Sequence, residues 1–215
     1  MRIIKPYVEP AIPGQPLPPA EYLYFLVEAA GRTCYLSERV EGDTTEKFIQ
    51  RLMARKHWSV LEHASISLRF ICDRGVTHEL VRHRIASYSQ ESTRYCNYSK
   101  GKFGHEITVI EPCFWDEDSK KYKMWKRSCE VSETLYLDLL DDGATPQEAR
   151  SVLPSSTKTE IVVTMNIREW RHFFEMRYLG VAGTPHPQMV EIAKMAFDLL
   201  CSTYPIFFED LKKAE

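Results

Sequence analysis

A cluster of basic and hydrogen-bonding residues lies between positions 82 and 94. The segment begins with Arg82-His83-Arg84 and ends with Arg94. Most side chains between these cations carry a hydroxyl or an amide: Ser87, Tyr88, Ser89, Gln90, Ser92 and Thr93. Hydroxyls and amides can bond to a base, and guanidinium groups bind phosphate through paired N–H donors. The segment therefore predicts a site for a nucleotide.

The basic triplet must be positioned by the element that contains it. Asp73 can cap a helix running to about Ala86, with an apolar side formed by Val76, Leu80 and Ile85. Arg84 falls within that apolar side, and an unpaired buried charge is costly, so its guanidinium must reach water or an acceptor. A bound phosphate or a partner subunit's carboxylate would serve. For the triplet alone the plainer explanation is that basic side chains complement the negative pole of a helix dipole.

A second arginine with apolar neighbours lies towards the C-terminal end. Asn166 and Glu169 can cap a helix that runs to about Tyr178. One side of this helix carries Trp170, Phe173, Phe174 and Arg177. Arg177 is therefore a second candidate for anion binding, although an arginine in a last turn can equally extend its charge to water.

The rest of the sequence predicts a mixture of strands and helices. Strands are expected at Ile3–Val8, Ser65–Asp73, Ile107–Ile110 and Thr157–Met165. Helices are expected at Glu21–Ala30, Thr44–Ala54, Met124–Leu140, after the capping box that starts at Thr145, and at Pro187–Leu200. Gly31 is expected to stop the first helix, and Val131 and Leu135 to lie on the apolar side of the long one. Because the elements do not alternate as regular βαβ units, the sequence predicts the α+β class.

Composition narrows the class of protein. The chain has 215 residues, of which 44% are apolar and 27% charged, as is typical of one soluble globular domain. A net charge of -2 argues against a nucleic-acid-binding domain. No segment has the roughly 20 apolar residues of a membrane-spanning helix. The six cysteines form no C-x-x-C pair, which favours reduced thiols in the cytoplasm over a zinc site, and no metal is expected.

The spacing of these motifs resembles that of one enzyme family. Arg82-His83-Arg84, followed after seven residues by Ser92 and then Arg94, resembles the signature of flavin-dependent thymidylate synthases. Shorter elements follow the family's order and spacing: His57–His63, Ala149–Pro154, Asn166–Arg168, His172-Phe173 and Arg177. The resemblance covers roughly Ile3 to Phe208. It implies one domain over residues 1–215, with a mixed, mainly antiparallel sheet packed with helices.

The resemblance also implies an activity and an assembly. Members convert dUMP to dTMP, with methylenetetrahydrofolate as carbon donor, FAD as the flavin and NADPH as reductant. They are homotetramers whose sites lie where subunits meet. The implied FAD contacts are Ser59, Arg82, His83, Arg84, Ile85, Gln90, Asn166, Arg168 and His172. The implied dUMP contacts are Glu79, Arg82, Gln90, Ser92, Thr93, Arg94, Arg150 and Arg177.

Arg177 carries the implied catalytic role. A cation near N3 and O4 of the uracil ring would stabilise negative charge there and make C5 a better carbon nucleophile. His57 is expected near the folate or the flavin ring. Three positions depart from the commoner family pattern: Glu79 replaces a glutamine, Gln90 a glutamate, and His172 an asparagine of some members. A carboxylate at Glu79 needs a partner, for which Arg82 or His83 is expected.

Three other functions can be read from the same residues. Cys96 could be a nucleophile activated by nearby Arg94, and Ser92 could be another, although no feature identifies its base. Four histidines could form a hydrolytic metal site: His57, His63, His78 and His83. The arginines could bind nucleic acid, with stacking by Tyr88, Tyr95 and Tyr98.

Overall fold

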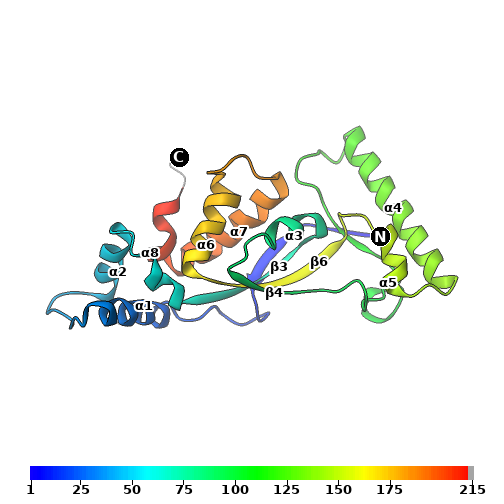
Figure 1. Cartoon of the computed structure of the whole chain (residues 1–215). Coiled ribbons are helices and arrows are strands. Elements are labelled where there is room, and N and C mark those ends of the chain that lie inside the picture. The colour runs from blue at the N-terminus through cyan, green and yellow to red at the C-terminus, as the bar shows by residue number, and fades with distance from the viewer. Residues whose placement is uncertain (213–215) are drawn as a thin grey trace.

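The computed structural model describes residues 1–212, without the side chain of Lys102, so the last three residues of the predicted domain lie outside this description. Its centre is a four-stranded antiparallel sheet (Figure 1). The strands lie in the order β2 (Tyr7–Pro10), β3 (Ser65–Asp73), β6 (Lys158–Asn166) and β4 (Ala86–Gln90). A separate parallel pair joins β1 (Arg2–Ile4) to β5 (Thr108–Ile110). The predicted mixed, mainly antiparallel α+β fold is confirmed.

Alternating side chains give the sheet one apolar face. Ile66 pairs with Met165 and Leu68 with Val163, and all four side chains are buried. The opposite face is more polar and carries Arg69 among others. Period-two alternation in β3 therefore directs one row of side chains into the core.

Helices cover the apolar face and extend beyond both ends of the sheet (Figure 1). Their bounds are α1 Ala20–Tyr35, α2 Thr45–Ala54, α3 Arg74–Leu80, α4 Lys120–Asp141, α5 Pro146–Ala149, α6 Ile167–Phe174, α7 Pro187–Thr203 and α8 Pro205–Phe208. Short 3₁₀ turns occur at η1 Trp58–His63, η2 Gly101–Phe103, η3 Arg150–Val152 and η5 Glu209–Leu211, and a π-turn at η4 Glu175–Leu179. The indole N–H of Trp170 donates to the carbonyl of Ile66 over 3.1 Å, which ties α6 to β3. Among residues 1–212, no helix combines the length and apolar character needed to cross a bilayer.

A second, smaller core lies under α4 and α5. It is formed by Tyr98, Ile107, Val109, Cys129, Tyr136 and Ala149. In Figure 1 this part lies at the opposite end of the sheet from α1, α2 and α8. The prediction that Val131 and Leu135 form the apolar side of this helix is wrong. Both lie on the outer side of α4, with exposed fractions of 51% and 48%.

The helix that Asp73 caps is shorter than predicted. The cap is present, since Asp73 Oδ1 accepts from the amide of Val76 over 2.7 Å, but α3 ends at Leu80. The chain then turns and pairs β4 with β6. The hydroxyl of Tyr88 donates to the carbonyl groups of Leu80 and His83, at 2.9 and 2.6 Å, and so stabilises the turn. Arg84 was predicted to be helical, and this prediction is wrong. It lies in the turn between α3 and β4, because the chain pairs with β6 soon after Leu80 instead of extending the helix.

Gly31 does not stop the first helix. The helix α1 continues to Tyr35, and a methyl group at Gly31 would lie 2.8 Å from Cδ1 of Leu52 and 2.9 Å from Cε1 of Phe48. The missing side chain therefore allows α2 to pack closely against α1. The single strand predicted at Ile3–Val8 is also wrong. The chain forms two strands there, β1 and β2, which belong to different sheets.

Candidate functional site

A cleft of about 1070 Å³ lies between the α3–β4 turn and helix α6. We call it the arginine cleft. Its lining includes most of the predicted flavin contacts: Arg82, His83, Arg84, Ile85, Asn166, Arg168 and His172. Arg177, from the π-turn η4, lines it too. The fold therefore brings together two basic segments that are more than 80 residues apart in sequence.

The cap of α6 positions the second segment. Asn166, the last residue of β6, accepts the amide of Glu169 on Oδ1 over 2.8 Å, as predicted. This bond starts the helix directly at the end of a core strand. The side chains of Arg168 and His172 consequently lie on its exposed side, whereas Trp170 and Phe173 are buried.

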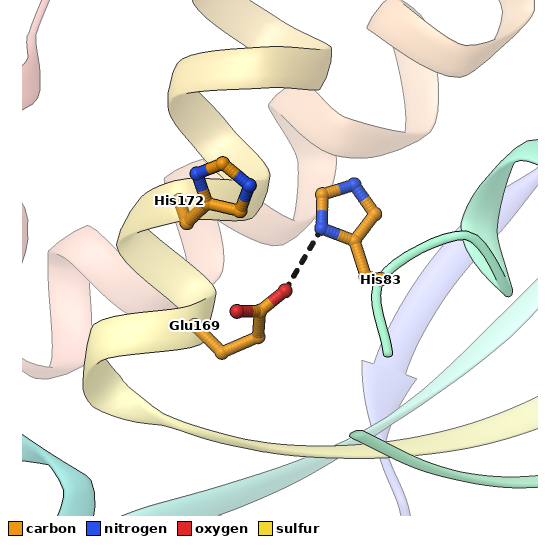
Figure 2. A group of neighbouring side chains, drawn as sticks. All are labelled: His83, Glu169 and His172. Carbon is orange, nitrogen blue, oxygen red and sulfur yellow. Dashed lines mark hydrogen bonds and ion pairs between the residues drawn. The ribbon is translucent and has the colours of Figure 1, made fainter. Parts of the chain in front are cut away.

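His83 forms a buried contact across the cleft (Figure 2). Its Nδ1 lies 3.0 Å from Oε1 of Glu169, and its Nε2 accepts from Nε of Arg177 over 3.2 Å. The lone pair on Nε2 is therefore in use, so the ring hydrogen belongs on Nδ1 and Glu169 accepts it. Burial, with the charges of Arg177 and His172, lowers the pKa of His83 to about 4. His83 is thus a neutral imidazole at pH 7.

Arg177 is held on two further sides by Glu79. Its Nη1 lies 3.1 Å from Oε2 of Glu79, and its Nη2 lies 3.4 Å from the backbone oxygen of the same residue. The sequence predicted Arg82 or His83 as the partner of Glu79, and this prediction is wrong, because the carboxylate pairs with Arg177. The reason is that α3 ends at Leu80, so that Arg82 and His83 lie in the turn and not on the next helical turn.

The cleft also carries cations without acidic partners. Arg82 and Arg84 are exposed, and within the described residues neither forms an ion pair. Arg168 differs, because its Nη1 lies 2.6 Å from Oε1 of Glu62. Arg171 is also paired, with both oxygens of Asp210 at 2.7 Å. Arg82 and Arg84 are thus the side chains best placed to receive an anion.

A smaller pocket of about 370 Å³ adjoins the arginine cleft and shares Trp58 and Arg168 with it. Ser59 and His57 line this pocket. Nδ1 of His57 lies 3.4 Å from the hydroxyl of Tyr35, and the two rings stack with centroids 6.1 Å apart. Both predicted residues are therefore next to the cleft and outside it.

The remaining predicted contacts form a second group. Nη2 of Arg94 lies 3.4 Å from Oε1 of Gln147 on α5, and Arg150 follows at the end of that helix. Ser92 and buried Thr93 precede Arg94. None of these residues lines the arginine cleft, and Figure 1 shows α5 and α6 towards opposite ends of the sheet.

Gln90 belongs to neither group. Its amide nitrogen donates to the hydroxyls of Thr77 and Thr159, at 3.1 and 3.2 Å. In this chain the side chain therefore joins α3 to β6. It does not line the arginine cleft.

Glu169 was not predicted as a site residue. The sequence analysis assigned it only to the helix cap that it forms with Asn166. Its position four residues before Phe173 puts its side chain on the apolar side of α6, where 7% of the residue is exposed. A buried carboxylate needs a hydrogen-bonding or charged partner. A glutamate on the apolar side of a predicted helix was therefore the sequence feature that could have identified this residue.

The other functions read from the sequence find little geometric basis. Within residues 1–212 a single group of His, Cys, Asp or Glu is close enough to hold a metal ion, namely His83, Glu169 and His172, and it includes just one of the four histidines considered. Both ring nitrogens of His83 are already hydrogen-bonded, and the cation of Arg177 lies beside them. The three tyrosines do not form one exposed stacking surface, because Tyr98 is buried, whereas Tyr95 is exposed.

The two candidate nucleophiles also lie outside the arginine cleft. Cys96 lines a different cavity, of about 670 Å³, together with Arg69 and Glu160 from the polar side of the sheet. The hydroxyl oxygen of Ser92 accepts from the backbone amide of Arg94 over 3.3 Å. Among the described residues, no histidine is bonded to the hydroxyl of Ser92. The geometry therefore favours binding roles over nucleophilic ones.

The fold is that of a known nucleotide methylase. The Streptomyces cacaoi UMP/dUMP methylase PolB, crystallised with 5-Br dUMP, matches with a TM-score of 0.76 at 24% sequence identity, over 97% of this chain and 96% of that chain. At sequence level, the family described as "Thymidylate synthase complementing protein" matches residues 24–206.

Curated relatives give the more particular assignment. The flavin-dependent thymidylate synthase of Mycobacterium avium is 35% identical over 211 residues, covering 88% of this chain and 80% of the relative. That of Pyrococcus furiosus is 39% identical over 141 residues, covering 65% of this chain. The aligned part spans 57% of the length of the Pyrococcus protein. The chain belongs to the flavin-dependent thymidylate synthase family.

Proposed function

We propose that this protein converts dUMP to dTMP by reductive methylation. Methylenetetrahydrofolate would donate the carbon, FAD would carry the hydride and NADPH would reduce the flavin. The observation that carries the proposal is the arginine cleft, in which Arg82 and Arg84 are unpaired cations and Arg177 is fixed by its own chain. Family membership supports the same reaction.

The lining of the cleft fits a flavin dinucleotide. FAD carries a pyrophosphate, and paired N–H donors of guanidinium groups suit its oxygens better than ammonium groups do. Arg82 and Arg84 offer such donors, and Arg168 lies across the cleft on α6. Ile85 gives the rim an apolar side chain, with an exposed fraction of 67%. A volume of about 1070 Å³ is ample for a ligand of this size.

Bound FAD would supply hydride transfer, which amino-acid side chains do not provide. The part assigned to the protein is to bind and polarise dUMP. Arg177 would face the uracil ring, where its charge stabilises negative charge at N3 and O4 and makes C5 more nucleophilic. Glu79 and His83 hold the guanidinium group before substrate arrives, so little reorganisation is needed.

We further propose that the dUMP site is completed by a second copy of the chain in a homotetramer. Arg82 and Arg177 line the arginine cleft, whereas Arg94 and Arg150 lie near α5. A symmetric assembly can place the second pair of one subunit against the cleft of its neighbour. The second pair, with Ser92 and Thr93, would then bind the dUMP phosphate.

The location of His57 supports a role next to the flavin. It lines the small pocket that shares Trp58 and Arg168 with the arginine cleft. The proposed role is to help place the folate or the flavin ring. All six cysteines are free thiols, which fits the reducing cytoplasm as the proposed location.

Purified protein tests the proposal directly. The expected result is a yellow protein whose visible spectrum shows bound flavin, which oxidises NADPH faster when dUMP is present, and which forms dTMP when methylenetetrahydrofolate is added. A colourless protein that gains no flavin on incubation with FAD, or one that forms no dTMP with all three substrates, would contradict it. Binding of an oligonucleotide with steep salt dependence, but not of dUMP, would favour the nucleic-acid alternative.

A further inference from the structure

We propose that Glu169 is a positioning residue, which sets the orientation of Arg177 by fixing the hydrogen of His83 on Nδ1. The inference rests on the proposed function of Arg177 at the uracil ring. Glu169 also lines the arginine cleft, and in this scheme its carboxylate acts through the histidine to which it is bonded (Figure 2).

The first step is the contact between Glu169 and His83. Both are buried, with exposed fractions of 7% and 5%, and their facing atoms are 3.0 Å apart. An ionised carboxylate can only accept hydrogen bonds. The hydrogen of a neutral His83 ring therefore lies on Nδ1. Because both residues are nearly buried, water competes weakly for this hydrogen bond, and the contact favours the hydrogen on Nδ1.

The second step is the contact between His83 and Arg177. With its hydrogen on Nδ1, the ring presents a lone pair on Nε2, and Nε of Arg177 donates to it over 3.2 Å. The opposite arrangement would set two N–H groups against each other at this distance. Glu169 thus decides whether His83 attracts or repels Arg177, although Glu169 itself lies beyond the ring.

The third step is the orientation of the guanidinium group. Arg177 is fixed at Nε by His83, and at Nη1 and Nη2 by Glu79. A guanidinium group has five N–H donors, and these contacts use three. One N–H therefore remains on each of Nη1 and Nη2, in the same plane. Two coplanar donors suit O4 and N3 of a uracil ring that has lost its N3 proton and carries the negative charge across these two atoms.

Loss of the carboxylate should release this arrangement. In Glu169→Met, no acceptor remains for Nδ1–H, so the hydrogen can move to Nε2 and turn Arg177 away. In Glu169→Gln, the amide oxygen can still accept from Nδ1, so the conservative variant should retain the orientation. Met and Gln have similar size, which separates the hydrogen bond from packing.

The test reads the ring directly. Protein labelled with ¹⁵N in histidine is examined by magic-angle-spinning NMR, and the His83 signals are assigned by their loss in His83→Gln. We expect Nδ1–H in the wild type and in Glu169→Gln, and Nε2–H in Glu169→Met. We also expect kcat to fall at least about tenfold in Glu169→Met, with bound flavin retained, and to recover in Glu169→Gln.

Glu28→Met is the matched control. Glu28 is equally buried and accepts from Thr45 and Arg32, but it lies in α1 and does not line the arginine cleft. Its loss should lower stability without changing the His83 ring. The inference is overturned if wild-type His83 carries its hydrogen on Nε2, or if Glu169→Met keeps the wild-type ring and kcat. A wild type with Nδ1–H and no thymidylate formation would instead refute the proposed function and leave the ring assignment intact.

Discussion

Arg177 and Glu79 are 98 positions apart in sequence, and their side chains form an ion pair of 3.1 Å at the arginine cleft. The same arginine donates to His83. A guanidinium group that is half buried and already bonded does not simply extend to solvent, which is the plainer explanation of an arginine in a last helical turn. The contacts explain how a π-turn at the end of α6 can hold a cation in one orientation.

Replacement of Arg177 by Ala should abolish methyl transfer. The variant would lack the charge that stabilises the uracil ring as it becomes nucleophilic, so we expect kcat to fall at least about 100-fold. Visible absorbance should show that most FAD stays bound, because Arg82 and Arg84 are unchanged. Arg177→Lys should not restore turnover, since an ammonium group cannot make the three separate contacts. Normal turnover in Arg177→Ala would refute the polarising role.

Replacement of Glu79 by Gln should be tolerated. The amide oxygen can still accept from Nη1 of Arg177, and the backbone oxygen is unaffected. We expect kcat within about threefold of wild type. Glu79→Leu should lose at least about tenfold in kcat, because one anchor of the guanidinium group is gone. Steady-state kinetics on both variants test this, and equal kcat in the two would show that the carboxyl group does not position Arg177.

Stability should fall as the pH is lowered from 7 to 4. The pKa of His83 is lowered to about 4 by burial and by the charges of Arg177 and His172. Below pH about 6.5 this histidine is protonated in the unfolded chain but stays neutral in the folded chain until about pH 4. The free energy of unfolding therefore falls by up to about 3 kcal/mol over this range. Burial raises the pKa of Glu169, whose contribution has the opposite sign.

Urea unfolding at several pH values measures the contribution of His83 to the pH dependence of stability. His83→Gln should have a flatter dependence between pH 6.5 and 4, because the titrating group is gone. His63→Gln is the control, since His63 is exposed and should leave the slope unchanged. An unchanged slope in His83→Gln would mean that His83 titrates normally in the folded protein.

Complementation between two inactive variants should reveal a shared site. Arg177→Ala removes a side chain of the arginine cleft, and Arg94→Ala removes one of the second group near α5. Each variant alone should be inactive or nearly so. If sites form between subunits, co-expression of the two should yield some sites with both arginines and restore part of the activity.

Tagging the two variants differently and purifying on both tags in succession shows whether mixed assemblies formed in that experiment. Activity that stays at the level of the separate variants, in assemblies proven to be mixed, would mean that each site is built from one chain. The same assembly should then be tested with Arg150→Ala in place of Arg94→Ala, since both arginines are assigned to the dUMP phosphate.

The sequence by itself determined the two long strands of the sheet, the helix caps and the family. The alternation from Ser65 to Asp73 predicted strand β3 with its bounds. Asp73 and Asn166 cap helices, as their side chains and positions predicted. Such features depend on neighbours within a few residues, and local pattern therefore predicts them. The spacing of the basic motif likewise identified the family without any knowledge of where its side chains lie.

Tertiary structure decided what the local pattern could not. The helix after Asp73 ends at Leu80, because the next residues pair with β6 from the other half of the chain. The partner of Glu79 is Arg177, and the buried role of Glu169 depends on His83 from another element. These choices are made by contacts between residues about 80 to 100 positions apart, whose energies no short window of sequence contains.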